Sequence, residues 1–204
     1  MSVRKLQTEF NTFYYFTFTC FQWISFFEIT DLYNYIYRSF DILKSKKIYT
    51  CGYVIMPNHL HSLVFTKNET EEINFHIGET KRFMSYEIVS RLKKLKRTDL
   101  LKIMQDTVNP NESKKKKIHN VFQPSADIKE IFTEKFIRQK LNYMHKNPVS
   151  GKWKLVDDYI DYIHSSARFY ELGEEGVYKV IHYSEAIKIP EQGFSAESSA
   201  ERLF

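Results

Sequence analysis

The first fifty residues change from a strand pattern to a helix pattern. Residues 13–21, F-Y-Y-F-T-F-T-C-F, are dense in aromatic and β-branched side chains, which favours a central strand. From Thr30 to Leu43 the apolar residues recur at helical spacing, which predicts a helix with lysines at its C-terminal end. Thr30 and Asp31 are both suited to cap the start of this helix.

Residues 51–65, C-G-Y-V-I-M-P-N-H-L-H-S-L-V-F, predict two strands joined by a tight break at Pro57-Asn58, the second beginning at His59. Because side chains on a strand alternate between faces, His59 and His61 are expected to point the same way. Two imidazoles about 6–7 Å apart on one sheet face can share a divalent cation. On its own the pair also suits ordinary surface histidines, since short motifs arise by chance.

Two more helices are predicted further along the chain. One is expected over residues 71–95, and the other over 127–146, where the following Pro148 ends it. The order strand, helix, strand, strand, helix is the first part of a split β-α-β unit. We therefore expect an α+β fold, a ferredoxin-like (split β-α-β) antiparallel sheet with helices packed on one face. The missing edge strand is expected among residues 100–122.

The composition is typical of a folded protein. The chain has 204 residues with 17 Phe and 14 Tyr, but only 6 Gly and 5 Pro, which excludes a linker or a low-complexity chain. We expect a single domain over residues 1–185 and a frayed tail over residues 186–204. Cys20 and Cys51 lie in apolar runs and are expected to be buried free thiols, although a disulfide between them stays open.

The sequence lacks the signals of a membrane or secreted protein. It has no run of about 18 apolar residues, and its N-terminal segment has no apolar core of a signal peptide. These features predict a cytoplasmic protein with no membrane partner. The formal net charge is +5 and the basic residues are clustered, which favours a polyanionic partner.

Three separated strings carry a resemblance to a known family. M-P-N-H-L-H at 56–61 resembles the HUH motif (His, hydrophobic residue, His) of single-tyrosine transposases, and above all that of the REP-associated tyrosine transposases. Q-K-L-N-Y-M-H-K-N-P-V at 139–149 and D-Y-I-H-S-S-A-R-F-Y at 161–170 are similar to further strings of the same family. The resemblance spans residues 13–170 and implies that residues 1–185 form one HUH transposase-like domain.

The resemblance implies DNA transposition, by metal-dependent cleavage and rejoining of single-stranded or hairpin DNA. In the family, one tyrosine on the third helix attacks a DNA phosphorus and leaves a 5′-phosphotyrosine bond and a free 3′-hydroxyl. The family tyrosine is expected a few residues after an aromatic-Gln pair, which here is Phe122-Gln123. That alignment puts the nucleophile position at Ala126, which has no hydroxyl.

Three interpretations of Ala126 stay open. Another tyrosine can supply the hydroxyl, and Tyr86 on the second helix and Tyr143 on the third are the nearest along the chain, although each also suits packing. The protein can be a non-cleaving DNA-binding protein derived from a transposase. Alternatively, a metal-activated water can act as the nucleophile, which would make the protein a hydrolase.

The resemblance also implies a third metal ligand beside His59 and His61. Glu130 lies four residues after Ala126, one turn along the same face of the expected helix, and Asp127 is the alternative. Either carboxylate also suits a solvated residue in a first helical turn. Two imidazoles with one carboxylate suit Mg²⁺, Mn²⁺ or Zn²⁺, and the resemblance favours Mg²⁺ or Mn²⁺ over Zn²⁺.

Basic residues on the second helix and at its exit are the candidate DNA contacts, because such groups position phosphates without reading the sequence. A lysine run at 114–117 adds to this patch, and a solvated helix face is the other interpretation. The candidate DNA-binding residues are Lys81, Arg82, Arg91, Lys93, Lys94, Lys96 and Arg97.

The expected partner is single-stranded or hairpin DNA, and a homodimer is open by analogy with family members that pair through their sheets or helices. An RNA-binding domain on the same sheet architecture is a further alternative. The strand at 13–18 offers aromatic side chains for stacking, but no basic-aromatic RNA motif accompanies it.

Overall fold

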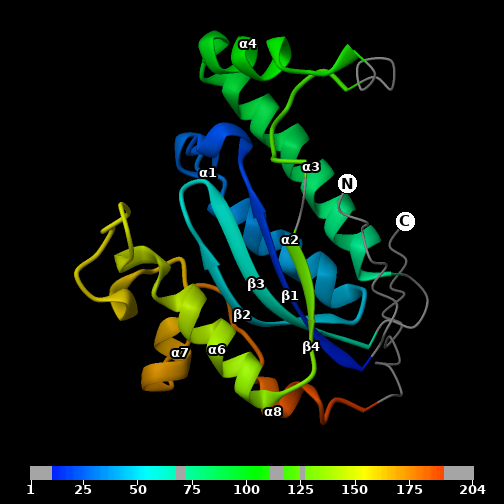
Figure 1. Ribbon diagram of the computed structural model, residues 1–204, viewed down its shortest axis with the longest axis vertical. Coiled ribbons are helices and arrows are strands. Elements are labelled where there is room, and N and C mark those ends of the chain that lie inside the picture. The colour runs from blue at the N-terminus through cyan, green and yellow to red at the C-terminus, as the bar shows by residue number, and fades with distance from the viewer. Residues whose placement is uncertain (1–10, 68–71, 111–116, 125–126, 191–204) are drawn as a thin grey trace, which may run out of the picture.

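Four antiparallel strands form a sheet at the centre of the molecule (Figure 1). They are β1 (Thr12–Thr19), β2 (Ile48–Ile55), β3 (His59–Thr66) and β4 (Asp127–Ile131), in the order β2-β3-β1-β4. This computed structural model describes residues 11–67, 72–110, 117–124 and 127–190. The predicted α+β fold is confirmed, with the strand order of a split β-α-β sheet.

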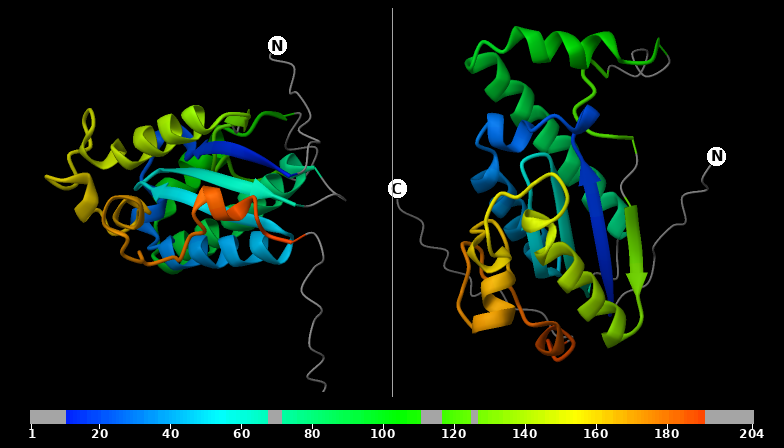
Figure 2. Two further views of the ribbon diagram at one scale, coloured as in Figure 1. Left: turned by 90° about the horizontal axis from the view of Figure 1, so that it is seen from below. Right: turned by 60° about the vertical axis from the view of Figure 1, so that its left-hand side comes forward.

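Helices cover both faces of this sheet (Figure 2). α2 (Tyr33–Ser45) and α3 (Ile73–Lys94) pack on one face, and α6 (Glu134–His145) packs on the other. This second layer corrects the expectation of helices on one face only. The shorter elements are η1 (Phe21–Trp23), α1 (Phe26–Ile29), α4 (Thr98–Asp106), η2 (Asn147–Val149), η3 (Tyr159–Asp161), α7 (Ala167–Leu172) and α8 (Tyr183–Ala186).

The second layer is needed because alternate side chains of β1 enter two separate apolar cores. The even-numbered Tyr14, Phe16 and Phe18 belong to the core beneath α2 and α3. The odd-numbered Phe13 and Tyr15 belong to the core beneath α6. β3 divides in the same way, and its odd-numbered residues face α6. A sheet that is apolar on both faces must be covered on both.

Residues 127–131 form the edge strand β4, and this corrects two expectations. The sequence pattern predicts that the third helix begins here and that the edge strand lies among residues 100–122. Instead, β4 pairs with β1, so that Asp127 lies opposite Thr17, and residues 98–106 form helix α4. The segment D-I-K-E-I alternates with the period of a strand, and the edge of β1, distant in sequence, is available to pair with it. The pairing with β1 is therefore the non-local cause of this strand.

The third helix, α6, begins at Glu134. The Thr133 side chain caps this helix, since its hydroxyl accepts a hydrogen bond from the backbone N–H of Phe136 (3.3 Å). The helix ends at His145, shortly before Pro148, as the proline predicts.

Most other predictions agree with the structure to within a few residues. The strand predicted at 13–21 is β1, and the helix predicted from Thr30 begins at Tyr33. Cys20 and Cys51 are buried and free, as expected. α8 crosses the expected domain boundary at residue 185. Residues 191–204 of the expected tail lie outside the described residues, and so do residues 114–116 of the lysine run. Within the described ranges, no helix is long and apolar enough to cross a membrane.

Gly52 allows α6 to approach the sheet closely. A Cβ atom added to this residue of β2 would lie 2.5 Å from Cδ2 of Leu141 and 2.7 Å from Cε of Met144, both on α6. Even an alanine at this position would push two side chains of α6 away. The register of β2 against β3 also shifts between Thr50 and Gly52. The packing of the Leu141 and Met144 side chains against β2 therefore depends on the absence of a side chain here.

We expect Gly52→Val to lower the free energy of unfolding by about 1–3 kcal/mol, because overpacking forces a core to shift. Urea denaturation followed by circular dichroism measures this change. Gly78→Ala on α3 is the control, since nothing lies within 4 Å of its added Cβ. It should raise the free energy of unfolding by about 0.5–1 kcal/mol, because glycine disfavours a helix. An unchanged midpoint for Gly52→Val would contradict the close packing of α6 on β2.

Candidate functional site

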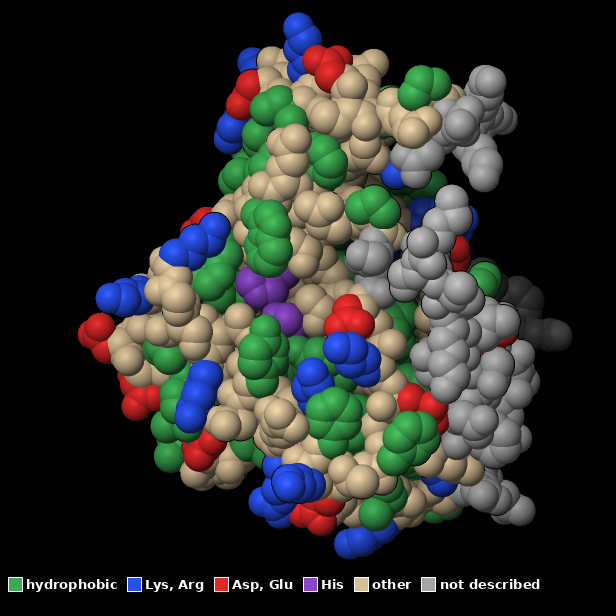
Figure 3. All heavy atoms as spheres, in the orientation of Figure 1, with side chains coloured by type: hydrophobic (Ala, Val, Ile, Leu, Met, Phe, Trp, Pro, Cys, Tyr) green, Lys and Arg blue, Asp and Glu red, His purple; other side chains and the backbone are tan. Residues whose placement is uncertain are grey.

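His59 and His61 lie side by side on the face of the sheet that α6 covers. Their ring centroids are 4.9 Å apart, the planes are nearly perpendicular at 85°, and the side chains are 4% and 6% exposed. Figure 3 shows histidine side chains at the centre of one face of the molecule, with hydrophobic, basic and acidic side chains around them. The alternation predicted for the second strand therefore brings the two imidazoles together.

Asn58 fixes the orientation of the His59 ring. Its side-chain Oδ1 lies 2.7 Å from Nδ1 of His59, and its Nδ2 donates to the backbone carbonyl of Trp23 at 2.5 Å. Because an amide oxygen only accepts, Nδ1 of His59 must donate this hydrogen bond. The lone pair of a neutral His59 then lies on Nε2, which is the nitrogen available to a metal.

Two hydroxyls of β1 hold the other ring. Nδ1 of His61 lies 2.8 Å from Oη of Tyr15 and 2.5 Å from Oγ1 of Thr17. A hydroxyl can accept as well as donate, so this contact allows Nδ1 to carry the proton and leaves Nε2 free. The sheet register that places Thr17 opposite His61 produces this contact.

Both imidazoles are held in the neutral form that binds a metal. Burial lowers the pKa of His59 to about 4, although a hydrogen bond with the Asn147 side chain raises it in part. Burial also lowers the pKa of His61 to about 3, and the positive charges of His59 and Lys140 act in the same direction. At neutral pH neither ring carries a proton that would compete with a cation.

α6 and the turn after it bring a polar group to each histidine. The Tyr143 ring lies 5.7 Å from the His61 ring, and its side chain is 58% exposed. Nζ of Lys140 lies 5.8 Å from the Tyr143 ring centroid. Asn147 follows at the start of η2 and contacts His59 through its side chain. Lys140 and Tyr143 share one face of α6 because neighbours on a helix are three or four positions apart. Asn147 lies beyond the helix, and its Nδ2 donates to the backbone carbonyl of Tyr143 (3.2 Å).

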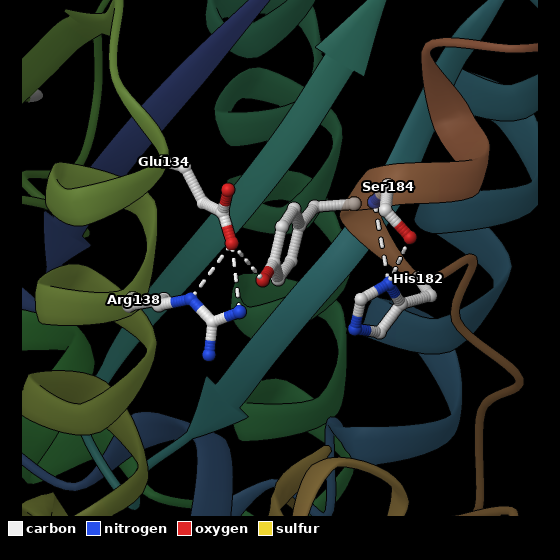
Figure 4. A network of polar contacts seen from close by, with 5 residues as sticks. Glu134, Arg138, His182 and Ser184 are labelled. Atoms are coloured by element: carbon white, nitrogen blue, oxygen red, sulfur yellow. Dashed lines mark hydrogen bonds and ion pairs between the residues drawn. The ribbon is translucent and has the colours of Figure 1, made fainter.

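A network at the other end of α6 fixes this helix against α8 (Figure 4). Oε1 of Glu134 accepts hydrogen bonds from Nε (2.9 Å) and an Nη (2.7 Å) of Arg138 and from the Tyr183 hydroxyl (3.0 Å). The hydrogen bond from Arg138 lowers the pKa of the Glu134 carboxyl below its usual range. His182 caps the start of α8, since its Nδ1 accepts from the backbone N–H of Ser184 (3.2 Å). The C-terminal segment thus holds the helix that carries Tyr143.

The structure separates Glu130 from the histidine pair. Glu130 is in β4 opposite Tyr14, whose side chain enters the core on the other face of the sheet, so Glu130 points away from His59 and His61. The expected helical spacing from Ala126 does not apply, because these residues form a strand. Asp127 lies opposite Thr17 on the histidine face, where it pairs with Lys129 (3.2 Å).

No third carboxylate, histidine or cysteine gathers with the pair among the residues that the structure describes. The polar groups nearest to the two rings are neutral: the Asn147 amide at His59, and the hydroxyls at His61. Two Nε2 atoms with an amide oxygen still fit a divalent cation that keeps open positions, because oxygen donors and water complete such a site.

The two substitute tyrosines differ in position. Ala126 lies outside the described residues, but the following residues are a strand and not the helix that the family alignment requires. Tyr86 is 62% exposed on α3, which packs on the opposite face of the sheet, and its ring contacts Phe83. Tyr143 is the candidate that the fold brings to the histidine pair.

The predicted basic patch lies on α3 and its exit, away from the histidine face. Three of its members form ion pairs with neighbouring carboxylates: Arg82 with Glu79, Arg91 with Glu87, and Arg97 with Asp99. Arg91 also donates to the backbone carbonyl of Thr30 (3.0 Å). Lys81 donates to the carbonyl of Gln123 (3.2 Å). Lys93, Lys94 and Lys96 lie at the C-terminal end of α3.

Two basic residues on the histidine face of the sheet were not predicted. Lys140 lies 4.7 Å from the Tyr15 ring centroid, and Lys129 lies opposite Tyr15 in the sheet. Lys140 lies three residues before Tyr143, and this helical spacing is the sequence signal that could have identified it. Asn147 could have been found in the same way, four residues after Tyr143.

We expect Asn58→Ala to lower the free energy of unfolding by about 1–3 kcal/mol, because it leaves buried hydrogen-bonding groups without partners. It should also let His59 populate both neutral tautomers, which long-range ¹H–¹⁵N NMR of the ring detects. Asn142→Ala, at an exposed position of α6, is the control and should change stability by less than about 0.5 kcal/mol. A His59 ring that keeps its proton on Nδ1 in Asn58→Ala would contradict this role.

A comparison with solved structures finds a similar fold in a REP-associated tyrosine transposase bound to a REP hairpin. The match covers 100% of this chain and 99% of the other, with a TM-score of 0.55 and 15% sequence identity. No protein-family model matches the chain, and no curated protein matches its sequence. The chain therefore shares the fold of this transposase along its whole length, as the three sequence strings led us to expect.

Proposed function

We propose that this protein is a transposase-like enzyme that binds single-stranded or hairpin DNA, cleaves one strand and rejoins it through Tyr143. The observation that carries the proposal is the position of Tyr143, an exposed tyrosine whose ring lies 5.7 Å from that of His61. The fold shared with a hairpin-bound transposase supports DNA as the partner. The HUH string and the order of the three sequence strings support the same reaction.

The histidine pair would hold a divalent cation through the two Nε2 atoms, with the Asn147 amide oxygen as the third ligand. When bound, this cation supplies polarisation of a phosphate oxygen. The chain itself prepares the site, because Asn58, Tyr15 and Thr17 occupy the Nδ1 atoms. Such contacts to the outer nitrogen orient the ring and raise its basicity as a ligand. The family resemblance favours Mg²⁺ or Mn²⁺ for this site.

Tyr143 would act as the nucleophile. Its Oη attacks the phosphorus, the bond between phosphorus and the 3′ oxygen breaks, and the DNA is left with a 5′-phosphotyrosine bond and a 3′-hydroxyl. The phenol loses one proton and the departing 3′ oxygen gains one, so the step is balanced. Attack by the 3′-hydroxyl of another end reverses the step and rejoins the strand without an external energy source.

Lys140 favours this reaction by its charge. Its ammonium lies beside the Tyr143 ring and above the Tyr15 ring, at 5.8 and 4.7 Å from their centroids. A nearby cation stabilises a phenolate and the added charge of a phosphate in its transition state. The exposed side of Tyr143 leaves room for a DNA strand to reach both groups.

We expect wild-type protein with Mn²⁺ and a labelled DNA hairpin to form a covalent protein–DNA band on a denaturing gel. Tyr143→Phe should abolish this band, because it removes the attacking oxygen, while hairpin binding stays within about twofold. Tyr86→Phe is the matched control and should leave the band unchanged. Shortened DNA without an adduct would indicate water as the nucleophile, and binding of intact DNA would indicate a non-cleaving protein; either result would contradict the proposal.

We expect His59→Ala and His61→Ala each to weaken Mn²⁺ binding at least tenfold, because second-shell changes alone typically cost 10–100-fold. Isothermal titration calorimetry measures this binding without DNA. DNA cleavage should be lost in both variants while the far-ultraviolet circular dichroism of the fold is retained. His119→Ala, in the segment after α4, is the control. Unchanged metal binding or cleavage in His59→Ala would refute the metal site.

A further inference from the structure

The two tryptophans of the chain flank His59. The ring centroid of Trp23 lies 5.9 Å from that of His59 in an edge contact, and the ring centroid of Trp153 lies 5.9 Å away at 48°. Trp23 is 55% exposed and Trp153 is half-buried. They come from distant parts of the sequence, since Trp23 ends η1 and Trp153 follows η2. A tryptophan this exposed beside a polar site is typical of a binding surface.

The backbone at Trp23 is built to hold this ring in place. Gln22 and Trp23 both have left-handed conformations, with φ of 50° and 60°. Such conformations are costly for residues other than glycine, and they persist where the surrounding structure imposes them. Here the Trp23 carbonyl accepts the hydrogen bond from Asn58, the same side chain that orients His59. The positions of the indole and the imidazole are therefore coupled.

Positive charge lies around these rings. Nζ of Lys152 lies 5.4 Å from the Trp153 ring centroid, and Lys140 lies beside Tyr143 on the other side of the histidine pair. Alternating aromatic and basic side chains are the pattern with which proteins bind single-stranded nucleic acid. Bases stack on the rings and phosphates contact the cations. A paired base cannot stack there, because both of its faces are covered within the duplex.

We propose that Trp23 and Trp153 stack unpaired bases of a single-stranded DNA segment and so place the phosphate between them over His59 and His61. This inference rests on the proposed function and assigns the two side chains that position its single-stranded DNA. Lys152 contacts the backbone of the same segment. The hairpin stem does not contact either indole.

Intrinsic fluorescence tests this inference directly, because the chain has no tryptophan other than these two. The probes are a blunt hairpin, the same hairpin with a four-nucleotide 5′ or 3′ extension, and the extended hairpin with abasic sites in place of the extension bases. We expect the base-bearing extension to quench the emission, and the abasic and blunt probes to leave it nearly unchanged. Fluorescence anisotropy of labelled DNA measures affinity in the same samples.

Trp23→Ala should weaken binding of the base-bearing probe by about 5- to 100-fold, the range that loss of one base–aromatic stack produces. Binding of the abasic probe should change less than twofold. Trp23→Phe should recover part of the affinity, since phenylalanine keeps a ring. Trp153→Phe, chosen because Trp153 also packs in the core, should remove its share of the quenching without unfolding the protein. Phe75→Ala on α3 is the matched control, at 53% exposure.

Equal affinity for the base-bearing and abasic probes would overturn the inference, as would binding without any change in emission. If the Tyr143 adduct still formed when either of these two results was obtained, the proposed function would stand. A protein that binds none of the probes would overturn both. Quenching by the blunt hairpin as strong as that by the extended one would assign the indoles to the duplex and would also overturn the inference.

Discussion

The pairing of β1 with β3 is the constraint on which the whole site depends. It sets Thr17 opposite His61 and Thr19 opposite His59, which puts the hydroxyls of β1 and the two imidazoles on one face. A slip of one residue would send both histidines into the opposite core, beneath α2 and α3. The burial of both faces excludes that slip, because aromatic side chains of β1 fill each core. The packing that stabilises the sheet thus also fixes the position of the site.

The site around the histidines is unusual in its charge. Its polar groups are two neutral imidazoles, an amide and hydroxyls, and Lys140 lies beside the Tyr15 and Tyr143 rings. Asp127, the carboxylate on this face that the sheet pairing identifies, is bound to Lys129.

The sequence alone was sufficient for the histidine pair and for the strands β1, β2 and β3, because these depend on local alternation. It was insufficient for β4, since five residues become a strand only when a distant partner offers them an edge. Because residues 127–131 are extended and not helical, Glu130 points to the face of the sheet opposite His59 and His61. Tyr143 could be named as a substitute but not preferred over Tyr86, because the choice depends on which face of the sheet each helix covers. Trp23 had no signal in the sequence, since its contact with His59 depends on a left-handed turn after β1.

The contact between α6 and α8 has a consequence for the order in which the parts of the site form during synthesis. The sheet edge at β4 and the histidine pair consist of residues made before residue 132, whereas α6 is held by Tyr183 and by a core that includes Tyr162 and Ala186. During synthesis, the two imidazoles can therefore be in place before the helix that carries Tyr143 is secured. The tyrosine reaches its final position only when the C-terminal segment has emerged and folded back. A nascent chain would therefore carry the histidine pair before it carried Tyr143 and Asn147.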